Sequence, residues 1–206
     1  MPRDADATRQ RLLKAARTEF ATHGLAGARV DRIAQNSGSN KAQIYHYFGS
    51  KDGLFDAVWG QFVGEVIESA AMEVHDLAGF AAHLTKLYAT YPEVARLITW
   101  QRLERSAEVP LPISTDSIRR NVDAIAAAQE AGIVTTRFEP GVLYSLVLHV
   151  ATLWDDMNPD VQSVVGLPDL QTRLTLVEQA MTCLLAPGPS SPSTNIDGAQ
   201  DLVTRR

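Results

Sequence analysis

The sequence lacks the features that stabilise small secreted proteins or anchor proteins in a membrane. Among its 206 residues there is one cysteine, Cys183, so an internal disulfide and a zinc site made of cysteines are both excluded. This cysteine lies in the apolar run 180–186, which favours a buried, inert thiol over a redox-active one. No apolar run approaches the ~20 residues that cross a bilayer, and the N-terminus has no signal-peptide core. We therefore expect a cytoplasmic protein with no membrane partner.

Known catalytic motifs are absent from the sequence as well. It contains no nucleophile elbow, no zinc-protease motif and no glycine-rich phosphate or dinucleotide loop. His75 and His83 are not spaced as two ligands on one helix, even with Asp76 beside them. Asp155 and Asp156 would point about 100° apart on a helix, which suits a general acid–base pair poorly. These absences predict a protein that is not an enzyme and needs no metal or cofactor.

What the sequence does have is an uneven distribution of charge. Hydrophobic residues make up 45% and charged residues 21%, and alternating β-branched patterns are scarce, which favours an all-α protein with its own core. The formal net charge is −5, yet residues 1–52 carry nine Lys or Arg against five Asp or Glu. The first quarter therefore has a net charge of +4 and the remainder −9. Positive charge confined to one end is what a local DNA footprint requires.

Residues 30–48, with the sequence VDRIAQNSGSNKAQIYHYF, have the pattern of two short helices joined by a tight turn. Ala34 is small enough for two helices to cross closely, and Gly38 can adopt the left-handed conformation that ends the first helix. Ile44, ten residues after the alanine, would close the small core between the helices. This spacing is typical of a helix-turn-helix, a motif that also occurs in proteins that do not bind DNA.

The second of these helices would present the residues that read DNA. Asn40 can cap it, with Gln43 three residues later in the reciprocal position of a capping box. The exposed face would carry hydrogen-bond donors and an aromatic ring suited to phosphates and base edges in a major groove. Lys51 would open the next helix, with Ser50 as its cap, where the ammonium and the helix N-terminus both favour a phosphate. The predicted DNA-binding residues are Arg29, Asn40, Lys41, Gln43, Tyr45, His46, Tyr47 and Lys51.

The flanks of this motif carry a family resemblance. An amphipathic helix ending at residues 23–24 precedes it, and the segment 45–51 (YHYFGSK) follows the turn and the start of the second helix. Together, residues from about 8 to 58 resemble the TetR family of one-component bacterial regulators. Two positions depart from that family. Arg29 stands where Thr or Ser usually caps the helix, a cap worth roughly 1 kcal/mol, and Ser39 stands where an apolar residue is preferred.

The resemblance implies a transcriptional regulator, most simply a repressor, that binds double-stranded operator DNA as a homodimer and is released by a small-molecule effector. It implies an all-α fold with a three-helix DNA-binding head at residues 1–52 and a larger helical ligand-binding and dimerisation domain at 53–186. The composition of residues 187–206 predicts a disordered tail. The helix after Lys51 would relay the signal of the effector. Two alternatives stay open: a helical ligand-binding or interaction protein without DNA binding, and a non-specific DNA-coating protein.

Beyond residue 76 the pattern predicts helices without DNA-reading motifs. Their expected ranges are 77–91, 92–105, 114–131, 140–156 and 169–185. The last two are apolar on most sides, more than a single small core needs, which predicts a two-fold interface built from the same pair on each subunit. An effector cavity between the helices would be lined by aromatic and adaptable residues. The candidates are Tyr88, Trp100, Tyr144, His149 and Trp154, with Arg96, Arg102 and Glu104 as possible polar anchors.

Overall fold

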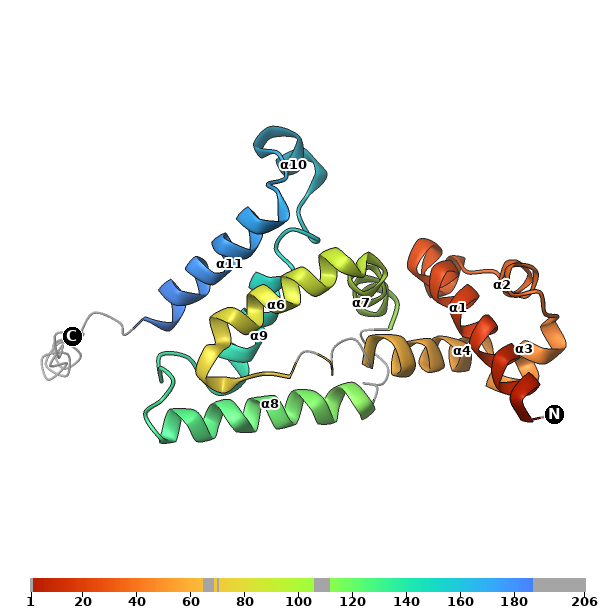
Figure 1. Cartoon of the computed structure of the whole chain (residues 1–206), viewed down its shortest axis with the longest axis horizontal. Coiled ribbons are helices and arrows are strands. Elements are labelled where there is room, and N and C mark those ends of the chain that lie inside the picture. Colours follow the sequence, from red (N-terminus) through yellow and green to blue (C-terminus); the bar gives the residue numbers. More distant parts are fainter. Residues whose placement is uncertain (1, 65–68, 70, 106–111, 187–206) are drawn as a thin grey trace, which may run out of the picture.

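Every regular element described by the computed structural model is a helix, as the composition predicts. The structure describes residues 2–64, 69, 71–105 and 112–186, and the predicted disordered tail lies outside them. Figure 1 shows an elongated molecule with the N-terminal helices at one end and the C-terminal helices at the other. We call the four helices from α1 (Pro2–Gly27) to α4 (Lys51–Val58) the head, and the helices from α6 onward the body.

The head is built around α1, which packs against α2 (Val30–Ser37) and α4, while α3 (Lys41–Phe48) contacts both α2 and α4. The apolar stripe of α1 and the inward residues of the short helices form one core. Its fully buried members are Leu12, Ala16, Phe20, Ile33, Ile44, Leu54 and Phe55. The rings of Phe20 and Phe55 meet edge to face, with centroids 5.2 Å apart. This core fixes the orientation of α2 and α3 on α1.

The first long helix is interrupted at Gly24, as predicted. A further helical turn follows the kink, so that α1 as a whole runs to Gly27. Gly24 has φ 69° and ψ −179°, a backbone region that is essentially restricted to glycine, so it kinks the chain. A Cβ at this position would lie 2.7 Å from the ring of Trp100 and 2.7 Å from a carboxylate oxygen of Glu104. The glycine is therefore required both by its conformation and by the close approach of the body.

The segment after α4 leads from the head to the body. α4 continues into a π-helical turn, η1 (Trp59–Val63), whose first and last residues are buried. π-helical turns often mark a bend or a functional point in a helix. Further along, the 3-10 turn η2 (Val74–Asp76) precedes α6 (Leu77–Thr90), and the side chain of Asp76 caps that helix by accepting from the amide of Gly79 (2.8 Å).

The body is centred on α6, which packs against α7 (Pro92–Arg105), α9 (Pro140–Ala151) and α11 (Leu170–Leu185), while α8 (Pro112–Glu130) packs against α9. These helices keep close to their predicted ranges except α9, which was expected to continue to residue 156. At this end of α9, the hydroxyl of Thr85 on α6 lies within hydrogen-bond distance of two carbonyl oxygens, that of Ala81 on its own helix (3.0 Å) and that of Ala151 (3.1 Å). A hydrogen bond from another helix leaves no trace in local periodicity.

α10 (Pro159–Val165) is a short helix that the sequence pattern does not predict. The side chain of Asn158 caps it by accepting from the amide of Asp160 (2.7 Å), and Pro159 occupies its first turn. Its apolar side chains stay exposed, Val164 to 85%, so no periodicity toward a core marks the helix in the sequence. Figure 1 shows α10 at the edge of the molecule, beyond α11 and α6.

Cys183 on α11 is exposed, so the expectation of a buried thiol is wrong for the single chain. The buried face of α11 is formed by Val177 and Met181. Cys183 follows Met181 by two residues, which places it about 200° further around the helix. An apolar stretch of sequence therefore contains both an inward and an outward face.

Candidate nucleic-acid interface

The turn between α2 and α3 has the geometry that the sequence predicts. Gly38 has φ 65° and ψ 30°, in the left-handed region, and its amide donates to the carbonyl of Gln35 (3.1 Å). The amide of Ser39 donates to the carbonyl of Ala34 (2.9 Å), which completes the end of α2. Ala34 and Ile44 are both buried, so the two helices cross closely.

α3 begins with a complete capping box. The side chain of Asn40 accepts from the amide of Gln43 (2.9 Å), and the side chain of Gln43 accepts from the amide of Asn40 (3.4 Å). These bonds satisfy two of the amides that a helix start leaves unpaired. Because the cap uses the side-chain oxygens, the two NH2 groups are the parts of Asn40 and Gln43 left to donate to DNA.

The outward face of α3 carries Lys41, Tyr45 and His46, which are all exposed, Tyr45 to 49%. Tyr47 is only half-exposed and packs against the core of the head, where its ring lies next to the rings of His46 and Phe48. Among the predicted DNA-binding residues of α3, Tyr47 is therefore turned toward the protein. Lys41, Tyr45 and His46 are exposed and Gln43 is half-exposed, so these four form the outward row of polar groups on α3.

The start of α2 is capped from another helix. The side chain of Arg29 makes no cap, but its amide donates to the carboxylate of Glu19 on α1 (2.8 Å). The same carboxylate, in a residue only 5% exposed, accepts from Arg32 at 2.9 Å (Nε) and 2.6 Å (Nη2). Burial opposes ionisation of Glu19, but the bonds from Arg32 and Arg29 and the nearby charges of Arg32 and His23 outweigh it and lower the pKa of this carboxyl.

Glu19 was not among the predicted site residues, although the sequence contains a signal that could have identified it. Glu19 is the only acidic residue between positions 7 and 30, a segment that carries four Lys or Arg before it and Arg29 after it. Because its carboxylate replaces the missing hydroxyl cap, Arg29 is free to hold its exposed guanidinium outward. A phosphate contact by Arg29 stays a prediction.

Lys51 lies at the start of α4, which Ser50 caps as predicted by accepting from the amide of Gly53 (2.9 Å). The ammonium of Lys51 donates to the carbonyl oxygens of Ala26 at the end of α1 (3.3 Å) and of Ala28 in the segment between α1 and α2 (3.4 Å). An ammonium has three donors, so these two bonds leave one for a phosphate. Lys51 therefore ties α4 to the end of α1, a contact that the sequence did not predict.

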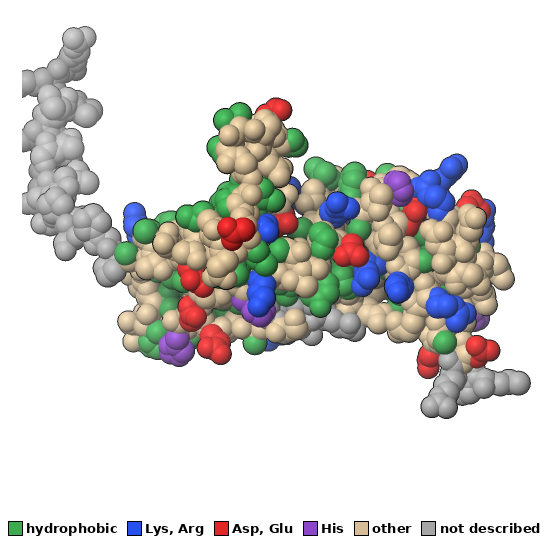
Figure 2. Space-filling view, turned by 45° about the horizontal axis from the view of Figure 1, so that its top comes forward, with side chains coloured by type: hydrophobic (Ala, Val, Ile, Leu, Met, Phe, Trp, Pro, Cys, Tyr) green, Lys and Arg blue, Asp and Glu red, His purple; other side chains and the backbone are tan. Residues whose placement is uncertain are grey.

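Lys41 is held by a residue outside the predicted set. Its ammonium lies 2.6 Å from the carboxylate of Asp31, which is in the first turn of α2. The hydrogen bond and the charge of Asp31 raise the pKa of Lys41. In Figure 2, Lys and Arg side chains are frequent at the end of the molecule that holds the head, whereas Asp and Glu side chains are common over the body. A carboxylate on the outward face of α2 and α3 is therefore a local exception.

The structure brings only part of the predicted effector site together. Tyr88 on α6 and Tyr144 on α9 are both buried, and burial, with smaller effects from Tyr144 and from Asp155, raises the pKa of Tyr88. The hydroxyl of Tyr144 accepts from the amide of Asn121 on α8 (3.0 Å). Trp154 follows α9 and packs against the same core, and its indole nitrogen is buried with no partner among the described residues. Two tyrosines and a tryptophan thus lie in the body with polar atoms facing inward.

Trp100 and Glu104 on α7 lie at the head and not beside these tyrosines. The indole of Trp100 donates to the carbonyl of Ala21 on α1 (3.3 Å). The carboxylate of Glu104 accepts from the amides of Leu25 (2.5 Å) and Ala26 (3.1 Å). Placing Trp100 and Glu104 in one cavity with the tyrosines was therefore wrong, because α7 turns this face toward the end of α1.

Two arginines strengthen the same contact between head and body. Arg105, one residue after Glu104, pairs with Asp56 on α4, and its guanidinium lies over the ring of Phe55. Arg17 on α1 lies 3.8 Å from the carboxylate of Glu93 on α7, and its guanidinium lies over the ring of Phe62 in η1, 4.2 Å from the centroid. α7 is thus joined to both α1 and α4.

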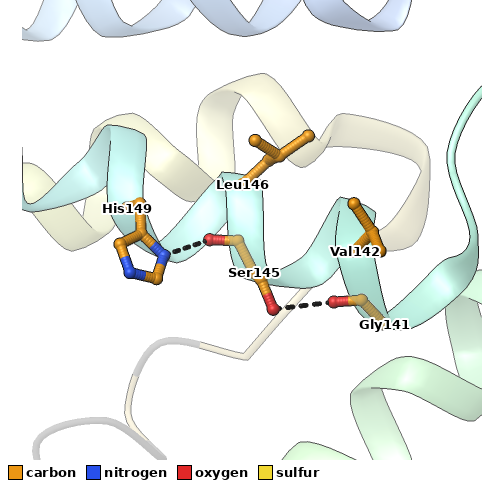
Figure 3. Close-up of a pocket in the computed structure, with 5 residues that line it drawn as sticks. All are labelled: Gly141, Val142, Ser145, Leu146 and His149. Carbon is orange, nitrogen blue, oxygen red and sulfur yellow. Dashed lines mark hydrogen bonds between the residues drawn. The ribbon is translucent and has the colours of Figure 1, made fainter.

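His149 faces the outside of α9. Figure 3 shows it beside an open hollow lined by one helix only, through Gly141, Val142, Ser145, Leu146 and His149. Its ring donates from Nδ1 to the carbonyl of Ser145 (2.7 Å), as the figure marks. A hollow with one wall cannot enclose a small molecule, so the structure separates His149 from the buried tyrosines.

Two kinds of site have no counterpart in the part of the chain that the structure describes. There, no three side chains of His, Cys, Asp or Glu are grouped so that they could hold a metal ion. Among the same residues, no helix combines the length and apolar character needed to cross a membrane.

The chain is similar to known proteins along most of its length. Residues 12–58 match the family model described as bacterial regulatory proteins, tetR family, and residues 76–182 match the model described as tetracyclin repressor-like, C-terminal domain. HTH-type transcriptional repressor SCO4008 of Streptomyces coelicolor is 37% identical over 165 residues, which cover 79% of this chain and 85% of that protein. HTH-type transcriptional repressor NicS of Pseudomonas putida is 32% identical over 108 residues, or 49% of this chain and 51% of that protein. The crystal structure of SCO4942 from Streptomyces coelicolor matches with a TM-score of 0.78 and 33% identity, covering 88% of this chain and 99% of that one.

Proposed function

This chain belongs to the TetR family of bacterial transcriptional regulators, and we propose that it is a repressor that binds operator DNA as a homodimer and is released by a small-molecule effector. The family is not enzymatic, in agreement with the missing catalytic motifs. A repressor of this kind acts on the chromosome, in the cytoplasm.

The observation that carries the DNA-binding proposal is the outward face of α3. A left-handed glycine and a capping box fix the helix on the head, and Lys41, Tyr45 and His46 extend from it into solvent. α3 has only eight residues, so its side chains can read a few base pairs in one major groove. One such helix supplies little specificity, which is why the proposal includes a second copy.

The homodimer is supported by apolar side chains that the single chain leaves uncovered. On α9 and α11, Leu143, Val147 and Val177 are buried within the chain, so part of the predicted interface belongs to its own core. Val142 and Leu176, however, are 50% and 42% exposed on the outward sides of the same two helices. We propose that these sides meet across a two-fold axis, which would set two heads about one DNA turn (~34 Å) apart.

The effector proposal uses the buried groups of the body. Tyr88, Tyr144 and Trp154 offer aromatic surface, and the indole nitrogen of Trp154 has no hydrogen-bond partner among the described residues. A buried donor left unpaired costs free energy that a bound acceptor would recover. α6 packs on α7, and α7 contacts α1 and α4, so a ligand that repacks the body would also bias the position of the head.

The DNA-binding proposal is tested by gel-shift competition between the DNA next to the protein's own gene and random DNA of equal length. Wild-type protein should discriminate between them. Tyr45→Ala should lose most of that discrimination because it removes an exposed ring from α3, whereas Tyr91→Ala, which removes a similarly exposed tyrosine of the body, should keep it. Equal binding of both DNAs by the wild type would instead indicate a DNA-coating protein.

The dimer is tested by sedimentation of variants with a charge on the proposed interface. Leu176→Glu should shift the protein toward a monomer and weaken operator binding, because a carboxylate would be buried without a partner. Ile118→Glu changes an apolar residue of similar exposure on α8 and should leave the dimer intact. A dimer of unchanged stability in Leu176→Glu would contradict the proposed interface.

One observation favours the alternative of a helical ligand-binding or interaction protein without DNA binding. The hydroxyl of Ser39 is buried in the turn with no partner among the described residues, at a position where the family resemblance predicts an apolar residue. A turn loosened in this way would hold α3 less firmly. Absence of any DNA binding by the wild-type protein in the gel shift would support this alternative.

A further inference from the structure

The exposed ion pair between Asp31 and Lys41 lies on the surface that the proposed function assigns to DNA. Asp31 belongs to the first turn of α2 and Lys41 is the first residue of α3, so the pair joins the two helices of the helix-turn-helix. The atoms are 2.6 Å apart, and the side chains are 70% and 55% exposed, so both are accessible from outside. An exposed ion pair of this kind contributes little to the stability of the fold. Its effect on DNA binding is therefore the more important one.

A carboxylate at this place opposes DNA binding unless it has a compensating role. Non-specific affinity for DNA comes from cations that neutralise phosphates and release counterions, each contributing about 0.9 to the slope of log K against log salt. A lysine paired with an aspartate contributes no net charge and must give up its partner to bind a phosphate. The pair therefore lowers the affinity of the head for DNA of any sequence.

Base recognition does not require the pair to separate. An ammonium has three donors, so Lys41 can keep one on Asp31 and direct the others to the adjacent O6 and N7 acceptors of guanine in the major groove. Lysine is otherwise a flexible point charge, and a fixed acceptor beside it restricts the positions that the ammonium can occupy. The partner that limits phosphate binding can in this way orient the same group toward a base.

We propose that Asp31 is a specificity-determining residue that positions Lys41 for the edge of a guanine base and withholds it from phosphates. This inference rests on the proposed function, because it requires the outward face of α3 to enter a major groove. It adds a residue that contacts no DNA itself and acts through Lys41.

The test compares Asp31→Asn with wild-type protein on two DNA probes across a series of salt concentrations. One probe is a duplex that the wild type selects from random-sequence DNA, and the other is a random duplex of the same length. Asp31→Asn should bind the random duplex more tightly, by about fivefold for each bound head near 0.15 M salt, with a slope steeper by about 0.9 for each bound head. Affinity for the selected duplex should rise less, because there Lys41 already contacts a base. The ratio of the affinity for the selected duplex to that for the random duplex should therefore fall at least threefold, owing to the phosphate contact that Lys41 gains on random DNA.

Asp52→Asn is the matched control. Asp52 is an exposed carboxylate in the first turn of α4 with no ion pair among the described residues. Its removal deletes the same charge without releasing a lysine, so both affinities should rise together and their ratio should stay constant. A ratio that falls equally in Asp52→Asn and Asp31→Asn would overturn the proposal, because the effect would then be one of net charge alone.

A second pair of variants tests whether Asp31 acts through Lys41. When Lys41 is first replaced by Gln, the further change Asp31→Asn should raise the affinities for both duplexes equally, as Asp52→Asn does. It should cause no further loss of discrimination between the two duplexes. An unchanged ratio and salt slope in Asp31→Asn, with a wild type that discriminates, would refute this inference and leave the proposed function intact. If the wild type selects no preferred duplex, the proposed function itself fails and this inference fails with it.

Discussion

Replacing Glu19 with alanine should destabilise the head by about 2–4 kcal/mol. The carboxylate caps α2 by accepting from the amide of Arg29 at 2.8 Å, and loss of a helix cap costs about 1 kcal/mol. It also accepts charged hydrogen bonds from Arg32 in a residue that is 5% exposed, and such bonds contribute about 1.5–3 kcal/mol. Glu19→Gln keeps one acceptor for the amide of Arg29, so its loss of stability should be about half as large.

The measurement is urea unfolding followed by circular dichroism at one fixed protein concentration, because the stability of a dimer depends on concentration. Amide exchange at Arg29 should also become faster in Glu19→Ala, since that amide loses its acceptor. Glu130→Ala removes an exposed carboxylate at the end of α8 and should stay within about 0.5 kcal/mol of wild type. If Glu19→Ala also stays within that range with an unchanged m-value, the cap does not stabilise α2 as argued.

Three further predictions concern the same head and its contact with the body. The pKa of Glu19 is held below its ordinary value of 4.5, because its hydrogen bonds outweigh the opposing effect of burial. The stability that ionised Glu19 contributes is therefore fully present above about pH 4.5 and is lost as pH falls through the lowered pKa. Glu19→Gln has no such carboxyl, so its free energy of unfolding should fall less steeply in acid than that of the wild type. Gly24→Ala should lower the free energy of unfolding in urea by about 2 kcal/mol or more, because φ is 69° and the new Cβ would lie 2.7 Å from Trp100. Gly27→Ala, where the nearest neighbour of the new Cβ is at 3.5 Å, should be nearly neutral. Glu104→Ala should raise hydrogen exchange at the amides of Leu25 and Ala26 by about tenfold, and unchanged protection would show that this carboxylate does not hold the head.

The sequence predicted those parts of the site that depend on neighbouring residues. Gly38 ends α2, Asn40 and Gln43 form the capping box, and Ser50 caps α4, each as expected. Each of these contacts joins residues three positions apart. The one exception is the bond from the amide of Ser39 to the carbonyl of Ala34, which spans five positions. A short segment contains both partners of such a contact, so its residue types are enough to predict it.

The positions of side chains on the body were harder to predict for a physical reason. A helical repeat identifies an apolar stretch without saying which neighbour will cover it. Cys183 was expected to be buried and is exposed, and Trp100 was expected beside an effector and instead contacts α1. α9 ends at Ala151, whose carbonyl oxygen lies 3.1 Å from the hydroxyl of Thr85 on α6. Each outcome depends on how one helix is rotated against another.

The sequence by itself determined that the chain is all-α, that its positive charge lies at one end, and that residues 30–48 form a helix-turn-helix. Only the tertiary structure decided that Glu19 caps α2, that Glu104 on α7 binds the end of α1, and that Asp31 holds Lys41. Helix formation and capping follow from bonds within one or two turns of chain. The other three contacts join residues 10 to 79 positions apart, and they exist only because the packing of apolar cores brings their helices together.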